Sequence, residues 1–356
     1  MTRLTFWGSS RFVGTTCDTG WVRYGGDTLK LLILDAEQIT RLLPMSECIE
    51  LMSGALAALA RGEVFQPLRT IIRPPDARGL LGLMPAYRGG EKGAFGLKAI
   101  CVFPDNPSIG KDAHQGMVIL FNQETGEPLA LMNASQVTAI RTAAVSAVAT
   151  RLLARSDAQQ LGIIGAGVQA RTHLLALACV REIKRARVAC RNKAHAEQLV
   201  LEMQDKVPFP IEATSSNDKA VRDADLVVVV TSAQEPVIRR TWIADGAHIN
   251  AIGTHSPKSR EIDTETMAAS RIFTDRRESL LNEAGDYVLA AQEGAVTPES
   301  VVAEIGELVI GAKQGRTSPR EITLFKSLGL AIEDVVSAEY VFRKAKSENV
   351  GTWVDF

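Results

Sequence analysis

The chain has 356 residues and a formal net charge of −1 at pH 7. This length predicts about two domains with a large core, and the balanced charge argues against a nucleic-acid partner. No apolar stretch reaches the ~18 residues of a membrane span. The five cysteines and five histidines are scattered without metal-ligand spacing, so we expect no metal site and a reducing, cytoplasmic location.

Residues 1–30 differ in character from the rest of the chain. They are polar and glycine-rich, they show no apolar period, and they lack the apolar segment of a signal peptide. We interpret this segment as an N-terminal extension that is disordered or only loosely attached, and we assign it no function.

The next part of the chain predicts a sheet flanked by helices. A short strand at 31–34 precedes Asp35, which can cap a following helix, and residues 45–61 have apolar side chains at helical spacing. Short strand patterns then alternate with turn residues, which indicates an antiparallel or mixed sheet. These patterns cover residues 68–72, 79–84, 93–102, 116–122 and 128–132, and a long Ala- and Thr-rich helix at 134–153 follows.

Residues 161–170 (LGIIGAGVQA) form a glycine-rich turn between an apolar run and a helical pattern. We expect a buried strand to end at Ile164. Gly165 then makes the tight turn, Gly167 lets the backbone approach a pyrophosphate, and the small Ala170 lets helix and strand pack closely. The helix N-terminus offers free N–H groups and a positive dipole end to the phosphates.

Three further apolar runs indicate a parallel, doubly wound sheet. A helical pattern at 168–180 leads to strand patterns at 185–190, 224–230 and 248–253. Continuous Val and Ile runs are typical of strands that are buried on both faces. The sequence therefore predicts an α/β dinucleotide-binding (Rossmann) domain, and a doubly wound domain without a nucleotide is the alternative.

The ends of two strands add candidate cofactor contacts. Thr231 and Ser232 directly follow the third strand of the predicted sheet, at an edge where ligands bind. The second strand ends in the sequence CRNK at 190–193, where NAD binders usually carry an acid. A guanidinium at Arg191 would pair with a 2′-phosphate. NADP(H) is therefore favoured, NAD(H) stays compatible, and a solvated Arg191 is the structural alternative.

The last third of the chain predicts elements beyond the nucleotide-binding unit. A strand at 271–274, a helix near 278–292 and a loop-rich stretch to residue 320 come first. The final helix is expected at 322–349, and a terminal helix of this kind commonly packs back on the first domain.

Lys98 and Arg141 are basic residues on otherwise apolar elements. Lys98 lies in the strand pattern FGLKAICV, where a lysine is costly unless it is paired or faces a cleft. A desolvated lysine has a lowered pKa that suits acid–base chemistry, although an edge-strand lysine is the structural alternative. Arg141 sits among small residues, which suits bidentate binding of a substrate carboxylate or an internal salt bridge. Arg69 and Arg73 are weaker candidates for carboxylate binding.

Two loop histidines complete the candidate set. His255 follows the fourth strand of the predicted parallel sheet, at the ligand-binding edge, and histidine titrates near neutral pH. It is a candidate acid–base or substrate contact, or a residue that touches only cofactor or solvent. His114 suits a structural hydrogen bond at least as well as catalysis.

Taken together, the chain resembles the ornithine cyclodeaminase/μ-crystallin family over residues 31–349. The resemblance implies an α/β fold with a Rossmann domain at 146–321. It also implies an α+β substrate-binding and dimerisation domain at 31–145 and 322–356, completed by the C-terminal helix, and a homodimer. The motifs that carry it are PLRT at Arg69, GLK at Lys98, HQG at Gly116, GEPLA at 126–130, TAIRTAA at Arg141, GAGVQA at 165–170, GxxxP at Gly253 and LFKSLGLAIED at 324–334.

The same resemblance implies roles for individual residues. Arg69, Lys98 and Arg141 would surround the carboxylate of a small imino or amino acid. The cofactor would lie on the glycine turn, with an arginine and an asparagine at its 2′ position. The implied cofactor contacts are Gly165, Gly167, Val168, Gln169, Arg191 and Asn192.

One departure from the cyclodeaminase pattern decides between activities. His255 stands where ornithine cyclodeaminases carry an aspartate, which weakens the cyclodeaminase interpretation. The resemblance then implies NAD(P)H-dependent reduction of an α-imino acid, such as a cyclic ketimine, to an L-amino acid, with Lys98 or His255 supplying the proton. Ornithine cyclodeamination, reductive amination of an open-chain 2-oxo acid as in alanine dehydrogenases, and a non-catalytic NADPH-binding role are the alternatives.

Overall fold

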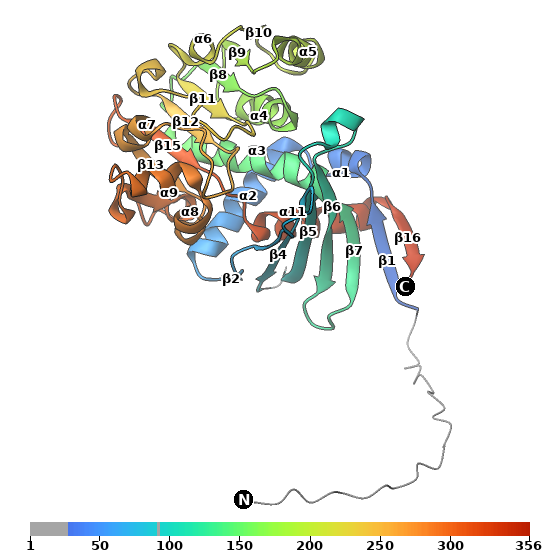
Figure 1. Cartoon of the computed structure of the whole chain (residues 1–356). Coiled ribbons are helices and arrows are strands. Elements are labelled where there is room, and N and C mark those ends of the chain that lie inside the picture. The colour runs from blue at the N-terminus through green and yellow to red at the C-terminus, as the bar shows by residue number, and fades with distance from the viewer. Residues whose placement is uncertain (1–27, 91–92) are drawn as a thin grey trace, which may run out of the picture.

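Two eight-stranded sheets organise the chain, which this computed structural model describes over residues 28–90 and 93–356. We call them the first sheet and the second sheet, in chain order. Residues 1–27, most of the predicted N-terminal extension, lie outside the described residues. Figure 1 shows the two sheets on either side of the long helix α3 (Ala134–Leu153).

The first sheet is mixed, as its sequence pattern predicts. Its strands run in the order β16-β1-β7-β6-β5-β4-β2, and β3 pairs with β4. β1 and β7 pair in parallel, and the other neighbours are antiparallel. The short strands β2 and β16 have no counterpart in the sequence prediction. The strands are β1 (Lys30–Leu34), β2 (Val64–Phe65), β3 (Thr70–Ile72), β4 (Leu80–Arg88), β5 (Ala94–Val102), β6 (His114–Asn122), β7 (Pro128–Asn133) and β16 (Thr352–Asp355).

Helices cover one face of the first sheet. α1 (Ala36–Leu42) begins at Asp35, whose side chain accepts a hydrogen bond from the backbone N of Gln38, as predicted. α2 (Met45–Ala60), α3 and α11 (Ala331–Glu348) share a core with this sheet. Within the described residues, no single helix is long and apolar enough to cross a membrane; α1 and α2 reach that length and composition only as a pair bent by 81°.

Side chains on β5 alternate between the helix-covered face and the opposite face, because a strand has a period of two. Lys98 and Ile100 are buried, whereas Phe95 is 46% exposed. Gly96 lies directly under α11, since a Cβ there would come within 2.5 Å of a methyl group of Val335. This close approach puts the inward-facing Lys98 beside the first turn of α11.

The opposite side of the first sheet, which we call the outer face, is apolar. Ile33, Phe95 and Met117 are exposed there. Strand register places half-buried apolar side chains between them on the same side of the sheet. These are Leu83, Leu97, Ile119, Phe121, Leu129 and Leu131. A contiguous apolar surface of this kind marks an interaction site in most proteins.

The second sheet is entirely parallel and has the predicted doubly wound topology. Its order is β10-β9-β8-β11-β12-β15-β13-β14. The direction of winding reverses between β8 and β11, and such a reversal opens a ligand crevice at the carboxyl ends of the strands. The strands are β8 (Gln160–Ile164), β9 (Arg185–Ala189), β10 (Ile211–Ala213), β11 (Leu226–Val229), β12 (His248–Ala251), β13 (Ser270–Thr274), β14 (Val301–Glu304) and β15 (Ile322–Lys326).

Shorter helices connect the strands of the second sheet. The helix predicted near residues 278–292 is two helices, because α8 ends at Glu283 and α9 begins at Gly285. The helices are α4 (Val168–Ala178), α5 (Lys193–Met203), α6 (Asn217–Val221), α7 (Thr264–Ala269), α8 (Arg277–Glu283), α9 (Gly285–Gln292) and α10 (Ile305–Val309). Short 3-10 turns lie at Asn106–Ile109, Gln204–Lys206, Arg240–Trp242 and Pro298–Ser300.

The helix predicted over residues 322–349 is wrong in its first part. Residues 322–326 form β15, which lies between β12 and β13 in the second sheet. All five residues are buried, and a short apolar run buried on both faces cannot be told from a helix by periodicity alone. The nucleotide-binding unit therefore extends to Lys326 rather than ending at residue 321. The predicted boundary at residue 145 falls inside α3, which packs against both α2 and α4.

Candidate active site

The three basic residues predicted to surround a carboxylate come from three different elements. Arg69 lies in the loop before β3, Lys98 on β5 and Arg141 in the second turn of α3. Lys98 and Arg141 are each 3% exposed, in agreement with their apolar sequence surroundings. Contacts with the start of α11 and with the loop of residues 327–330, which we call the β15–α11 loop, bring the three together.

Lys98 is held by an acidic partner. Its Nζ lies 2.7 Å from Oδ2 of Asp334 and 3.5 Å from Oγ1 of Thr138. Burial and the nearby charge of Arg141 lower the pKa of Lys98 to about 8, against the opposing effect of Asp334. The lysine is therefore protonated at neutral pH but gives up its proton more readily than an exposed lysine.

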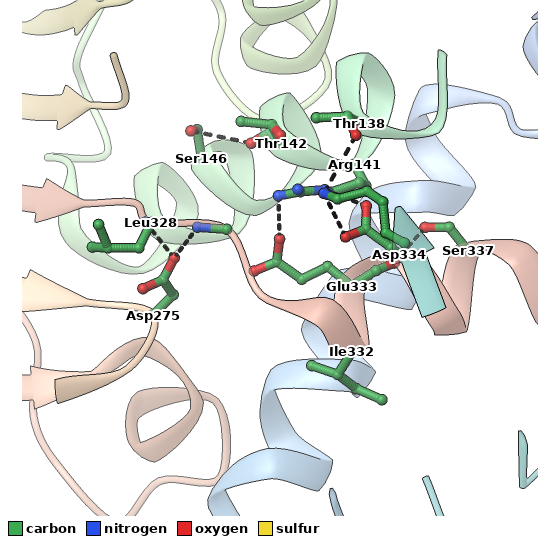
Figure 2. Close-up of polar contacts among 12 residues, drawn as sticks. Thr138, Arg141, Thr142, Ser146, Asp275, Leu328, Ile332, Glu333, Asp334 and Ser337 are labelled. Atoms are coloured by element: carbon green, nitrogen blue, oxygen red, sulfur yellow. Dashed lines mark hydrogen bonds and ion pairs between the residues drawn. The ribbon is translucent and has the colours of Figure 1, made fainter. Parts of the chain in front are cut away.

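Arg141 forms the internal salt bridge that its sequence left open, and it keeps further donors. Nη1 donates to Oε2 of Glu333 at 2.6 Å, and Nε donates to Oδ1 of Asp334 at 3.0 Å. Figure 2 shows the guanidinium above both carboxylates. Nη2 makes no hydrogen bond to any described residue. Gly329 gives the guanidinium room, since a Cβ there would lie 2.5 Å from Nη1.

Arg69 is bound on the other side of the β15–α11 loop. Its Nε lies 2.9 Å from Oε2 of Glu283, and Nη2 donates to the carbonyl oxygens of Leu328 and Gly329. Asp275 accepts hydrogen bonds from the backbone N of the same two residues, at 2.6 and 2.8 Å. The loop is thus fixed between the side chains of Arg69 and Asp275, and Gly329 also lies against the guanidinium of Arg141.

The acidic half of this cluster was not predicted from the sequence. Four carboxylates surround the three basic groups: Asp275, Glu283, Glu333 and Asp334. Burial raises the pKa of Glu333 to about 7, against the effect of Arg141, and burial also raises the pKa values of Asp275 and Glu283. Glu333 and Asp334 are the last two residues of the LFKSLGLAIED motif, and this motif could have indicated them. No local pattern indicated Asp275 or Glu283.

His255 and His114 lie close enough to this cluster to respond to its charge. Solvent reaches His255, yet protein atoms crowd its ring; this desolvation, with the charges of Arg69 and Lys326, lowers its pKa well below the usual value. Desolvation and the charge of Lys98 lower the pKa of His114. Desolvation and the neighbouring positive charges both lower the pKa of His255, so its imidazole is neutral at pH 7.

The glycine turn between β8 and α4 has the geometry that a dinucleotide requires. Gly165 has φ +117°, and a Cβ there would lie 2.5 Å from the carbonyl oxygen of Val230. Gly167 is the N-cap of α4 without a side-chain cap, and no heavy atom crowds its Cβ position. The N–H groups of Val168 and Gln169 at this helix start are therefore available to a pyrophosphate. The residues present fit the cofactor.

Of the three polar residues after β9, two are held in local contacts and one is free. Asn192 caps α5, because its Oδ1 accepts a hydrogen bond from the backbone N of Ala194. Lys193 pairs with Glu197 at 2.7 Å. Arg191 is exposed and makes no ion pair within the described ranges. Two residues were predicted at the 2′ position of the cofactor. The guanidinium of Arg191 is free to bind a phosphate, whereas Oδ1 of Asn192 already accepts the capping hydrogen bond.

The predicted contacts after β11 have different environments. Thr231 donates hydrogen bonds to Glu261 from both its backbone N and its Oγ1. The side chain of Ser232 is exposed. Over residues 28–90 and 93–356, no group of three or more His, Cys, Asp or Glu side chains could hold a metal ion. The described cysteines are all free thiols: Cys48, Cys101, Cys179 and Cys190.

Comparison with known proteins agrees with this architecture. The Ornithine cyclodeaminase/mu-crystallin family matches residues 30–349. The ketimine reductase mu-crystallin of Mus musculus is 37% identical over 313 residues, which cover 87% of this chain and 96% of the relative. The predicted family resemblance is therefore confirmed.

Solved structures extend the similarity to the fold. The Δ1-pyrroline-2-carboxylate reductase of Thermococcus litoralis, in complex with NADH and L-proline, has a TM-score of 0.88 and 40% identity, covering 90% of this chain and 99% of that one. An archaeal alanine dehydrogenase dimer with bound NAD has a TM-score of 0.86 and 34% identity, covering 92% and 100%. This chain belongs to the ornithine cyclodeaminase/mu-crystallin family.

Proposed function

We propose that this protein is an NAD(P)H-dependent imine reductase that converts an α-imino acid to the L-amino acid. A cyclic ketimine such as Δ1-pyrroline-2-carboxylate or Δ1-piperideine-2-carboxylate is the proposed substrate. The observation that carries the proposal is the buried Lys98, paired with Asp334 next to Arg141. The relatives named as reductases of such imines support the interpretation of this arrangement as an imine-reducing site.

Arg69 and Arg141 are the proposed anchors of the substrate carboxylate. Each guanidinium is fixed on one side by acids and carbonyl groups and still has N–H groups to donate. Fixed, planar donors orient a carboxylate better than a mobile point charge does. This orientation lowers the entropic cost of the reaction.

Lys98 is the proposed proton donor. A bound nicotinamide cofactor would supply the hydride that adds to the imine carbon. The imine nitrogen then carries the electron pair of the broken π bond and takes a proton, which Lys98 can give because its pKa is about 8. The neutral His255 has no proton of comparable acidity to give, so we assign it a contact with substrate or cofactor.

We propose that NADP(H) is the preferred cofactor and that NAD(H) is accepted. The free guanidinium of Arg191 after β9 supports the first part, because it can pair with a 2′-phosphate. The named structures with bound NADH and NAD support the second part.

Cyclodeamination is disfavoured and reductive amination is the second candidate. His255 provides no carboxylate for a distal amine, and the cations Arg69 and Lys326 near it would repel an ammonium group. The 34% identity to an alanine dehydrogenase favours an open-chain imine, formed from a 2-oxo acid and ammonia, as the alternative substrate.

A substrate panel separates these possibilities. NADPH and NADH oxidation would be followed by absorbance with the two cyclic imines and with pyruvate plus ammonia. Cyclodeamination leaves the cofactor unchanged overall, so it would be followed as release of ammonia from L-ornithine in the presence of oxidised cofactor. We expect the fastest turnover with a cyclic imine and NADPH. Faster turnover with pyruvate plus ammonia would replace the proposed substrate with the open-chain alternative. Cofactor binding without any turnover would indicate the non-catalytic role.

We further propose a homodimer that forms through the outer face of the first sheet. The apolar side chains on this face, including Phe95 and Met117, are exposed in the single chain, and an archaeal relative is described as a dimer. The free thiols of the described residues support a reducing, cytoplasmic location.

A further inference from the structure

The carboxylate of Glu261 joins two loops at the ligand-binding edge of the second sheet. It is fully buried, and it accepts three hydrogen bonds of 2.6 Å. Oε1 accepts from the backbone N and from Oγ1 of Thr231, in the loop after β11. Oε2 accepts from the backbone N of Gly253, in the loop after β12. One side chain thus sets the spacing of the two loops.

The two loops approach each other so closely that residue 253 has no room for a side chain. A Cβ on Gly253 would lie 2.1 Å from the carbonyl oxygen of Thr231 and 2.4 Å from Oε1 of Glu261. The hydroxyl of Thr231 has a single proton, which goes to Glu261, and its oxygen accepts from the backbone N of Ala233. Both carboxylate oxygens of Glu261 and the hydroxyl of Thr231 therefore have assigned partners.

A second buried carboxylate fixes the position of Glu261 itself. Oδ1 of Asp286 accepts from the backbone N of Glu261 at 2.7 Å, and Oδ2 accepts from Oγ1 of Thr254. Lys326 at the end of β15 lies 2.8 Å from Asp286 and donates to Oγ1 of Thr254. Since Thr254 precedes His255, the same network holds the loop that carries this histidine.

We propose that Glu261 is a positioning residue for the nicotinamide cofactor, acting through Thr231 and Gly253. The inference rests on the proposed function, since it assumes that a dinucleotide binds at this edge of the sheet. Because Glu261 is fully buried, we assign it an indirect role. Its role is to hold the two loops so that their exposed groups, including Ser232, face the ligand without further reorganisation.

Substitution by glutamine tests the role because it changes the hydrogen-bond chemistry and little else. The amide of Glu261→Gln has one acceptor oxygen, and its NH2 group would face a backbone N–H of Thr231 or Gly253. We expect the Kd for NADPH and NADH, measured by cofactor fluorescence, to rise roughly 10- to 100-fold, as for loss of a charged hydrogen bond. The KM for the imino acid should change little.

Asp225→Asn is a matched control at the opposite edge of the second sheet. The carboxylate of Asp225 accepts from the backbone N of Gln159 and Gln160, and so joins β8 to β11 at their amino ends. This variant should lower thermal stability without changing the cofactor Kd. Glu261→Asp keeps the charge with a shorter reach and should recover part of the affinity lost in Glu261→Gln.

The pH dependence of binding gives a second, independent readout. Burial raises the pKa of Glu261 to about 7, while Lys326 opposes and Asp286 adds to this effect. Below that pH, protonation removes acceptor capacity, so the Kd for NADH should rise as the pH falls through about 7. NADH lacks a 2′-phosphate, so its own charge stays constant there. In Glu261→Gln this dependence should disappear.

The outcomes separate this inference from the proposed function. Unchanged cofactor Kd in Glu261→Gln, or an equal loss of affinity in Asp225→Asn, would overturn the positioning role while leaving the reductase proposal intact. Tight cofactor binding by the unaltered chain without imine reduction would overturn the reductase proposal, and the Kd comparison would still decide the role of Glu261. Absence of any dinucleotide binding would overturn both.

Discussion

The ammonium of Lys98 lies 2.7 Å from Oδ2 of Asp334, and both side chains are almost fully buried. Burial and Arg141 lower the pKa of Lys98, and the carboxylate of Asp334 opposes that effect, which leaves the pKa at about 8. Asp334 therefore keeps Lys98 protonated at neutral pH, while burial and Arg141 let it give up that proton more readily than an exposed lysine.

We expect kcat to fall as the pH rises above about 8, because Lys98 loses the proton that it gives to the substrate. Asp334→Asn should move this fall to lower pH, since the charge that supports the protonated lysine is gone. Profiles of kcat against pH check both points. Asp355→Asn, which removes a surface pair with Lys30, should leave the profile unchanged. An unshifted profile in Asp334→Asn would rule out Lys98 as the donor.

Gly329→Ala should impair substrate binding through Arg141. Gly329 has φ +72°, and an alanine Cβ would press on the guanidinium from 2.5 Å. Gly311→Ala is the control: its φ is +73°, but its Cβ would meet nothing within 4 Å. Both variants should lose about 1 kcal/mol of stability from the left-handed backbone. Only Gly329→Ala should raise the KM for the imino acid; equal KM values would contradict the contact.

Arg69→Lys should raise the KM for the imino acid roughly tenfold or more, because a point charge replaces a planar fork of donors. It also loses the paired contacts to the carbonyl groups of Leu328 and Gly329. Arg73→Lys, at an exposed residue nearby, is the matched control and should behave as the unaltered protein. If the two variants have the same kinetics, Arg69 does not hold the carboxylate.

Arg191→Ala should weaken NADPH binding roughly 10- to 100-fold, the effect of losing a charge-assisted hydrogen bond. The Kd for NADH should stay constant, because NADH has no 2′-phosphate. Lys193→Ala removes a neighbouring cation that already pairs with Glu197, so it should affect NADPH far less. Fluorescence titration with both cofactors measures these differences. Equal losses for NADPH and NADH would show that Arg191 does not select the phosphate.

The double variant of Phe95→Glu and Met117→Glu should convert the proposed dimer to a monomer. It places two charges on the outer face of the first sheet, where burial in an interface would be costly. Leu201→Glu changes a 77% exposed side chain on α5 and should leave the dimer intact. Light scattering after size-exclusion chromatography gives the mass. A dimer that persists in the double variant would place the interface elsewhere.

Local patterns predicted much of this fold because the relevant signals lie within a few residues. Helix α3 matches its predicted limits, and the turn at Gly165 joins a buried strand to a helix as expected. The apolar run at 322–326 was predicted wrongly because the prediction used only these local signals. Its local pattern fits a helix or a buried strand equally, and only its place between β12 and β13 decides.

The sequence alone indicated Lys98, Arg141 and the glycine turn, since a cation in an apolar element and a glycine pair in a strand–helix turn are local facts. The tertiary structure decided how the basic residues are paired. Arg141 and Asp334 are 193 residues apart in the chain, and packing of α11 against α3 and β5 places them in contact. Because an ion pair needs only proximity in space, no local period could reveal it. The pairing of Asp334 with Lys98 and Arg141 is therefore visible only in the folded protein.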